Sequence, residues 1–207
     1  MCGNVQTLTR EDGQIVDLAR GLTVTLRVSN DSTDSGPGRS TGNAISWAAS
    51  KSRAPLVIGF GNVLLGDDGA GVHLVTRLRS EGVPRVCEFI DGGTMSFSLL
   101  SYVEATNSML VIDAAELDRA PGTIALFEGS AMDDFLKSTR RRTVHEVGLI
   151  DLLDMARLED SLPGQRALLC IQPGTIDWGE TLSPAVVEAL SRAVDEAREL
   201  LDRWILA

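Results

Sequence analysis

The sequence predicts an α/β fold, a three-layer α/β/α sandwich around a largely parallel sheet. Short apolar runs alternate with segments whose apolar residues recur at helical spacing, which is the pattern of a parallel sheet covered by helices. Hydrophobic residues make up 43% and charged residues 23% of the 207, enough apolar side chains for a full core. No apolar run approaches the ~20 residues of a membrane span, so we expect no membrane segment.

Composition divides the chain near residue 55. Residues 30–43 are almost entirely Asn, Asp, Ser, Thr, Gly, Pro and Arg, which indicates a linker within an extension that covers residues 1–54. Residues 55–207 have the length of one domain and contain 13 of the 19 basic and 24 of the 29 acidic residues. A net charge of −10 repels phosphate backbones, so a nucleic-acid partner is not expected.

Five apolar runs of strand length occur in this domain. They cover residues 56–60, 86–90, 109–112, 123–127 and 167–171. The run at 86–90 is followed by Asp91-Gly92-Gly93, and the run at 109–112 is followed directly by Asp113. Because the fourth run comes after Pro121-Gly122, we expect it to be an edge strand.

Helical spacing of apolar residues predicts helices near 72–78, near 97–103 and from about His145 onward. The last helix has the strongest signals, since Ser183 is a good cap residue and Pro184 suits the first helical position. One apolar stripe follows on this helix, formed by Val187, Leu190, Val194, Ala197 and Leu201.

Ligands of open α/β sheets bind beyond the carboxyl ends of the strands, and acidic residues gather there. Asp67 and Asp68 follow the first strand, Asp91 the second and Asp113 the third. For the adjacent pair two interpretations stay open: one Asp caps the next helix while the other is solvated, or one is a metal ligand or catalytic carboxylate. A carboxylate at the end of a buried strand is costly unless a cation or hydrogen-bond donors meet it.

The glycines beside these acids do not form a dinucleotide-binding loop. Gly59-Phe60-Gly61 would require a third glycine at position 64, where the chain has Leu64. Two adjacent carboxylates would also repel a pyrophosphate. A nucleotide-binding module is therefore a weak alternative.

The chain has two histidines. His73 falls within a helical pattern, which is typical of a surface or packed residue. His145 begins H-E-V-G-L, which lacks the second histidine of a zinc-protease motif. His145 is either an ordinary helix-start residue or an imidazole that joins two carboxylates around a divalent ion. The preceding Arg140–Arg142 are expected in a solvated loop, or alternatively to hold a peptide substrate.

Cysteine and serine nucleophiles are not indicated. Three cysteines, an odd number without a C-x-x-C pair, suit a reducing compartment, so we expect a cytoplasmic protein. Cys87 and Cys170 lie within apolar strand patterns and are expected to be packing residues. No G-x-S-x-G motif is present.

Five motifs in order carry a resemblance to a known family. They are G-F-G-N-V-L-L-G-D-D-G-A-G-V (59–72), D-G-G-T (91–94), V-I-D-A (111–114), P-G-T (121–123) and H-E-V-G-L (145–149). Over about three quarters of its length the chain resembles the nickel–iron hydrogenase maturation endopeptidases. The resemblance implies a five-stranded sheet in residues 55–207, and cleavage that removes the C-terminal extension of a nickel-loaded hydrogenase large-subunit precursor.

The resemblance also implies the site. Asp68, Asp113 and His145 match the family's nickel-recognising trio. Asp91 matches an acid that the family places near the site. It begins the D-G-G-T segment, which is expected to bind substrate and consists of Asp91, Gly92, Gly93 and Thr94. The candidate catalytic carboxylates are then Asp68, Asp91 and Asp113. The nickel is carried by the substrate, although other divalent ions could occupy the set in the isolated protein. The resemblance implies a monomer.

Two alternatives remain open at this level. Peptidyl-tRNA hydrolases also have Gly-x-Gly-Asn after their first strand, here Gly59 to Asn62, but they need a basic face for RNA. In the N-terminal extension, Met1-Cys2 and the alternating residues 22–28 are similar to the start of small hydrogenase-assembly chaperones, although Gln6 stands where those have proline. A disordered extension or an upstream start codon is the favoured interpretation of residues 1–54.

Overall fold

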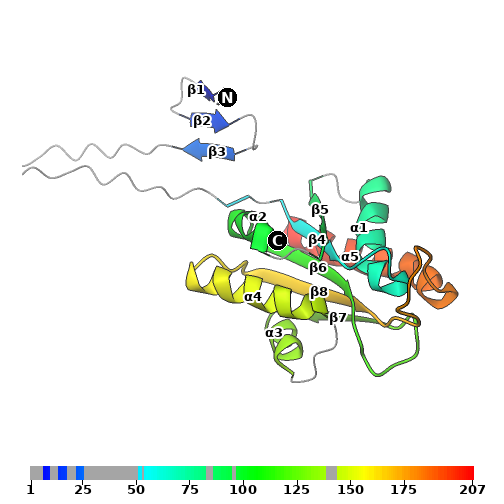
Figure 1. The fold of residues 1–207 in the computed structure, drawn as a ribbon. Coiled ribbons are helices and arrows are strands. Elements are labelled where there is room, and N and C mark those ends of the chain that lie inside the picture. The colour runs from blue at the N-terminus through cyan, green and yellow to red at the C-terminus, as the bar shows by residue number, and fades with distance from the viewer. Residues whose placement is uncertain are drawn as a thin grey trace, which may run out of the picture. The chain divides into compact units, whose positions relative to one another are not determined.

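Figure 1 shows the computed structural model of the chain. It describes residues 7–9, 14–17, 22–25, 51–52, 54–82, 86–94, 97–138 and 144–207, with the side chains of residues 7–25, 97 and 144–147 outside the description. The chain forms two compact units, Met1–Ser50 and Lys51–Ala207.

The described part of the first unit is a three-stranded antiparallel sheet. Strands β1 (Thr7–Thr9), β2 (Gln14–Asp17) and β3 (Leu22–Thr25) pair in that order. β3 falls on the alternating pattern of residues 22–28. The linker predicted at residues 30–43 lies outside the described residues.

The second unit is built on a five-stranded sheet in the order β5-β4-β6-β8-β7. The strands are β4 (Leu56–Phe60), β5 (Glu88–Gly93), β6 (Ser108–Ala114), β7 (Ile124–Glu128) and β8 (Gln165–Ile171). β5, β4, β6 and β8 run parallel, while β7 pairs with β8 in the antiparallel sense and forms one edge. The predicted mostly parallel sheet and the predicted edge strand are both confirmed.

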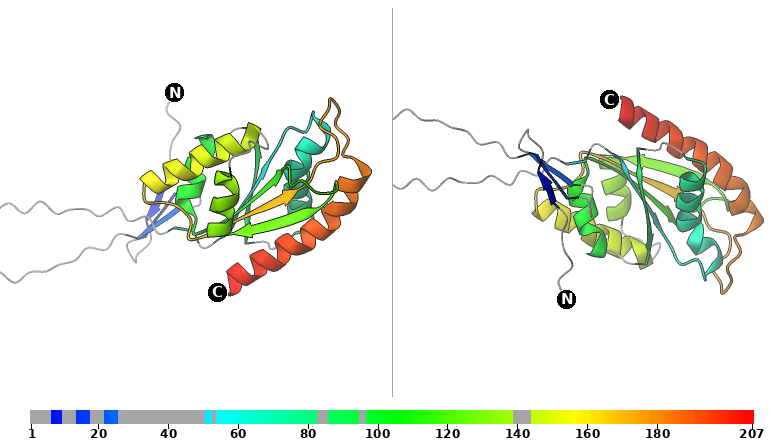
Figure 2. Two further views of the ribbon diagram at one scale, coloured as in Figure 1. Left: turned by 90° about the horizontal axis from the view of Figure 1, so that it is seen from below. Right: turned by 90° about the horizontal axis from the view of Figure 1, so that it is seen from above.

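Helices cover both faces of this sheet (Figure 2). α1 (Ala70–Ser80) and α5 (Pro184–Leu206) pack on one face, and α2 (Leu100–Ala105), α3 (Ser130–Lys137) and α4 (Val144–Leu158) pack on the other. Two short 3-10 helices, η1 (Gly66–Gly69) and η2 (Phe97–Leu99), precede α1 and α2. The architecture is the expected three-layer α/β/α sandwich.

Each central strand contributes side chains to both cores. In β6, Leu110 and Ile112 belong to the core under α1 and α5, whereas Met109 and Val111 belong to the core under α2, α3 and α4. All of these side chains are fully buried. A strand buried on both faces is mostly apolar, which explains why the middle of each central strand was readable as an unbroken apolar run.

β5 differs from its prediction. It spans Glu88–Gly93 rather than residues 86–90, and Val86 is 56% exposed. The predicted stop at Asp91-Gly92-Gly93 is wrong, because those residues are the last three of the strand. β5 is an edge strand with only one buried position, so it lacks the apolar run that identifies a central strand.

The predicted stripe on α5 needs one correction. Val187 is 50% exposed, and Val186 is the buried residue of that first turn. Helix α3 was not predicted, because only Met132 and Leu136 of its eight residues are buried. Within the part of the chain that is described, no helix is both long enough and apolar enough to cross a membrane.

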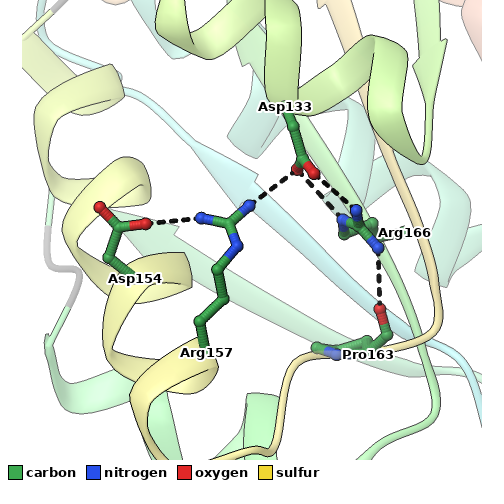
Figure 3. A network of polar contacts seen from close by, with 5 residues as sticks. All are labelled: Asp133, Asp154, Arg157, Pro163 and Arg166. Atoms are coloured by element: carbon green, nitrogen blue, oxygen red, sulfur yellow. Dashed lines mark hydrogen bonds and ion pairs between the residues drawn. The ribbon is translucent and has the colours of Figure 1, made fainter.

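A polar network joins three elements on one side of the sheet (Figure 3). Arg166 of β8 donates to both carboxylate oxygens of Asp133 in α3, over 3.1 Å and 2.6 Å. Arg157 of α4 lies 3.0 Å from the same carboxylate and 2.5 Å from Asp154. The hydrogen bond from Arg166 lowers the pKa of Asp133 below its ordinary value, burial opposes this change, and the charges of Arg166 and Arg157 reinforce it.

Candidate active site

The candidate site lies at the end of the sheet where the carboxyl ends of β4, β5 and β6 meet. Because these strands are parallel neighbours, their carboxyl ends meet at one rim. η1 follows β4 at this rim and packs against β6. The chain thus brings the acidic residues of η1, β5 and β6 to the same end of the sheet, as predicted.

Two glycines allow η1 and α1 to approach the strand ends. Gly61 has a φ of +133°, and a Cβ added there would lie 2.0 Å from the carbonyl oxygen of Asp68. A Cβ on Gly71 would lie 2.3 Å and 2.4 Å from the carbonyl oxygens of Phe60 and Ile112. These glycines therefore serve close backbone packing, in agreement with the rejection of a dinucleotide-binding loop.

Asp67 is fully buried and fixes a distant loop. Its Oδ2 accepts hydrogen bonds from the backbone N–H groups of Gly174 (2.7 Å) and Thr175 (3.0 Å), and its Oδ1 accepts one from Ser183 (2.6 Å). Burial raises the pKa of Asp67, but the hydrogen bonds from Ser183, Thr175 and Gly174 outweigh it and leave the pKa below its ordinary value. Asp67 is therefore a structural acid.

Asp68 and Asp113 are buried carboxylates at neighbouring strand ends, with 5% and 3% exposure. Asp68 Oδ2 accepts a hydrogen bond from the N–H of Asn62 (2.9 Å), and Asp113 Oδ1 accepts one from the N–H of Ala114 (2.8 Å). The interpretation in which one of the adjacent acids caps the next helix and the other is solvated is wrong. Both acids are buried, and the cap position of α1 is held by Gly69, without a side-chain hydrogen bond.

A cavity of about 240 Å³ opens at the same end of the sheet. Asp91, Gly93 and Thr94 of the D-G-G-T segment line it together with four further residues, Gly61, Asn62, Val63 and Val72. Asp91 is exposed, and its Oδ1 accepts the N–H of Gly93 (2.9 Å). Asn62 links the cavity wall to Asp68 through its backbone N–H.

Gly92 is the member of the D-G-G-T segment that does not line the cavity. It is buried, and an added Cβ would lie 2.8 Å from Cγ2 of Ile58. Gly92 therefore packs against β4, whereas its neighbours form the wall.

The histidines differ in what the structure describes. His145 lies in the first turn of α4, but its side chain, like residues 140–142, is outside the described part. His73 lies in α1, and its buried Nε2 has no hydrogen-bond partner. Within the described residues, no three His, Cys, Asp or Glu side chains are grouped so as to hold a metal ion. The trio of Asp68, Asp113 and His145 therefore stays a prediction.

The two described cysteines are not activated nucleophiles. Cys170 is fully buried in β8, and Cys87 is partly buried. Burial, and secondarily the charge of Asp202, raises the pKa of Cys87 to about 11. A thiol with such a pKa is protonated at neutral pH. The prediction that Cys170 is a packing residue is confirmed, since it belongs to the core under α2, α3 and α4. Cys87 is only partly buried and packs against the other core, under α1 and α5.

Asn62 was missed from the sequence as a site residue, and Asp67 was named without its structural role. Asn62 both lines the cavity and holds Asp68, and its signal was its place directly after the strand-ending Gly61. Asp67 was not separated from Asp68, because the donors that define its role lie 107 to 116 positions further along the chain.

Comparison with known proteins identifies the family. Residues 72–200 match the model of the HycI hydrogenase maturation protease family. The hydrogenase expression/formation protein HoxM of Cupriavidus necator is 34% identical over 72% of this chain and 74% of its own length. The hydrogenase expression/formation protein HupD of Rhodobacter capsulatus is 32% identical over 75% of each chain.

Solved structures of similar fold agree with this family assignment. The hydrogenase maturating endopeptidase HybD from E. coli superimposes with a TM-score of 0.67 and 26% identity, covering 72% of this chain and 93% of that one. The [NiFe] hydrogenase maturation protease HybD from Thermococcus kodakarensis gives a TM-score of 0.63 and 28% identity, covering 72% and 99%. The peptidyl-tRNA hydrolase and nucleotide-binding alternatives are set aside. The fold, the motifs and these matches together show that the chain belongs to the hydrogenase maturation protease family and is a peptidase.

Proposed function

We propose that this peptidase removes the C-terminal extension of a nickel-loaded large-subunit precursor of a nickel–iron hydrogenase. The observation that carries the proposal is the burial of Asp68 and Asp113 at neighbouring strand ends, beside a cavity lined by the D-G-G-T segment. The nickel ion enters as part of the substrate and is not a resident cofactor of the protease.

The donor set suits such an ion. Burying a carboxylate is costly, and two of them at one rim are neutralised best by a divalent cation. Carboxylate oxygens and imidazole nitrogen are ligands that borderline divalent ions such as nickel accept. We therefore assign Asp68, Asp113 and, from the start of α4, His145 to the recognition of the nickel in the precursor.

This recognition makes cleavage depend on the presence of nickel in the precursor. In its absence, Asp68 and Asp113 repel each other and offer the precursor no attraction. In its presence, the two carboxylates hold the metal end of the precursor, so the adjoining peptide enters the cavity beside Asp91. Holding the scissile bond there converts an encounter in solution into an oriented, effectively unimolecular step.

We assign the general-base role to Asp91, which makes the enzyme aspartic in type. Asp91 is the exposed carboxylate of the cavity wall, within reach of solvent. A water molecule adds to the scissile carbonyl carbon, its proton passes to the carboxylate, and the leaving amine takes a proton as the bond breaks. The competing route, in which the nickel of the substrate polarises the carbonyl or the water, leaves Asp91 a binding role only.

The test is a mass measurement on the precursor. Mixing the protein with nickel-loaded precursor should release the extension, and mixing it with nickel-free precursor should not. Asp68→Ala and His145→Ala should each abolish release, whereas Asp195→Ala, which removes an exposed acid of α5, should not. Trimming at the normal rate by Asp68→Ala would show that the site assignment is wrong.

A further inference from the structure

Exposed apolar side chains gather beside the candidate site. They are Val63 and Leu64 in the turn between β4 and η1, and Ile176 and Trp178 in the loop between β8 and α5. Trp178 is 81% exposed. We call these four residues the rim patch.

Backbone hydrogen bonds hold the two segments together. The N–H of Gly66 donates to the carbonyl of Gly179 (2.7 Å), and the N–H of Gly179 donates to the carbonyl of Leu64 (2.9 Å). Leu65 and Gly179 form a parallel bridge, so Leu64 and Trp178 hold equivalent, neighbouring positions. Figure 2 shows the two segments running side by side at this end of the sheet in both views.

Asp67 also holds the loop between β8 and α5 in place. Its N–H donates to the carbonyl of Thr175 (3.1 Å), while its carboxylate accepts from Gly174, Thr175 and Ser183. The loop is thus fixed by these polar contacts and by the burial of Leu182, and not by burial of Ile176 or Trp178. The exposure of Ile176 and Trp178 therefore needs a reason other than folding. Scattered exposed hydrophobes are ordinary, but a group on paired segments marks an interaction surface.

The charged residues around the rim patch indicate the chemistry of the segment that it binds. Asp177 and Glu180 are exposed in the same loop, and residues 173–183 contain no Lys or Arg. A surface that combines an exposed tryptophan with carboxylates complements an apolar segment that carries basic residues.

The rim patch is continuous with the cavity, because Val63 belongs to both. A polypeptide bound in the cavity leaves it over this surface. We propose that the rim patch docks the precursor segment adjoining the scissile bond, and that this segment is apolar with flanking Lys or Arg. The proposal rests on the proposed function, whose substrate it describes further.

The main test is the kinetics of Trp178→Ala on nickel-loaded precursor. An exposed tryptophan at the centre of an interface contributes about tenfold or more to binding, so KM should rise by about that factor with kcat unchanged. The control is Leu158→Ala, which removes an 86% exposed apolar side chain from the end of α4 and should leave KM unchanged. Both variants should keep the unfolding midpoint of the wild type.

A second measurement tests the charge. Asp177→Lys combined with Glu180→Lys should raise KM, and salt should raise the KM of the wild type more than that of this variant. An unchanged KM in Trp178→Ala would overturn the proposal. Failure of the wild type to trim the precursor would instead overturn the proposed function.

Discussion

Two carboxylates that are adjacent in the chain make different contacts. Asp67 is held by three backbone N–H groups, whereas Asp68 accepts a hydrogen bond from the backbone N–H of Asn62, a residue of the cavity wall. The local residue pattern alone gives the two residues the same chemistry. Their environments separate them, and so does the effect expected of their substitution.

We expect Asp67→Asn to destabilise the protein by about 2–3 kcal/mol, because an amide NH₂ would face backbone donors that the carboxylate now satisfies. Asp68→Asn should leave the free energy of unfolding within about 1 kcal/mol of the wild type and abolish cleavage. Urea unfolding and the precursor mass assay measure the two effects. The reverse pattern, a destabilised Asp68→Asn and an active, stable Asp67→Asn, would contradict these roles.

Asp91 offers a test of the chemical step. If it is the general base, Asp91→Asn lowers kcat by about 10²–10⁴ with little change in KM. If it only binds substrate, KM rises and kcat is kept. Steady-state kinetics on nickel-loaded precursor distinguish the two results.

The sequence predicts the acidic residues of the site but not the groups that they contact. Asp68, Asp91 and Asp113 were found because each follows, or stands at the end of, an apolar strand. The roles of Asp67 and Asn62 were not predicted, because they depend on contacts that a single strand-end pattern does not contain.

The backbone at the start of α1 packs closely against the ends of β4 and β6 at Gly71. Ala is favoured over Gly inside a helix by about 1 kcal/mol, so propensity alone predicts that Gly71→Ala stabilises. We expect the opposite, a loss of about 3 kcal/mol, because the added Cβ would lie 2.3–2.4 Å from two backbone carbonyl oxygens. Gly164→Ala, where an added Cβ meets nothing within 4 Å, is the matched control in thermal unfolding.

The network around Asp133 predicts a pH dependence. The pKa of Asp133 in the folded protein is below the ordinary 3.8, so its contribution to stability is complete above that pH and is lost as pH falls through the folded pKa. Asp133→Asn should therefore cost about 1–3 kcal/mol at pH 7, with the difference from the wild type shrinking below about pH 4. Urea unfolding at pH 7, 5 and 3 measures it; a difference that grows on acidification would be inconsistent with this contact.

Elements buried on both sides were the easiest to predict. β4, β6 and β8 have unbroken apolar runs because each faces two cores. β5 was misplaced by two to three residues because it is an edge strand, and α3 was missed because two buried residues leave no periodic signal.

For the molecule as a whole, the two compact units predict that residues 51–207 fold without residues 1–50. The family match lies entirely within that segment. We expect the fragment to unfold cooperatively and to trim the precursor with a KM and kcat within about twofold of the full chain. A fragment that folds but trims slowly would assign residues 1–50 a part in substrate handling.

The contacts of Asp67 have a consequence for how a cleavage position is chosen. They join the loop carrying Trp178 to η1, which carries Asp68, so the proposed docking surface and the proposed nickel-recognising acid keep a fixed spacing. If both roles hold, the bond that is cut is set by its distance along the precursor from the docked segment and the nickel. Inserting residues into the precursor between those two points should move the cut, whatever side chains flank it.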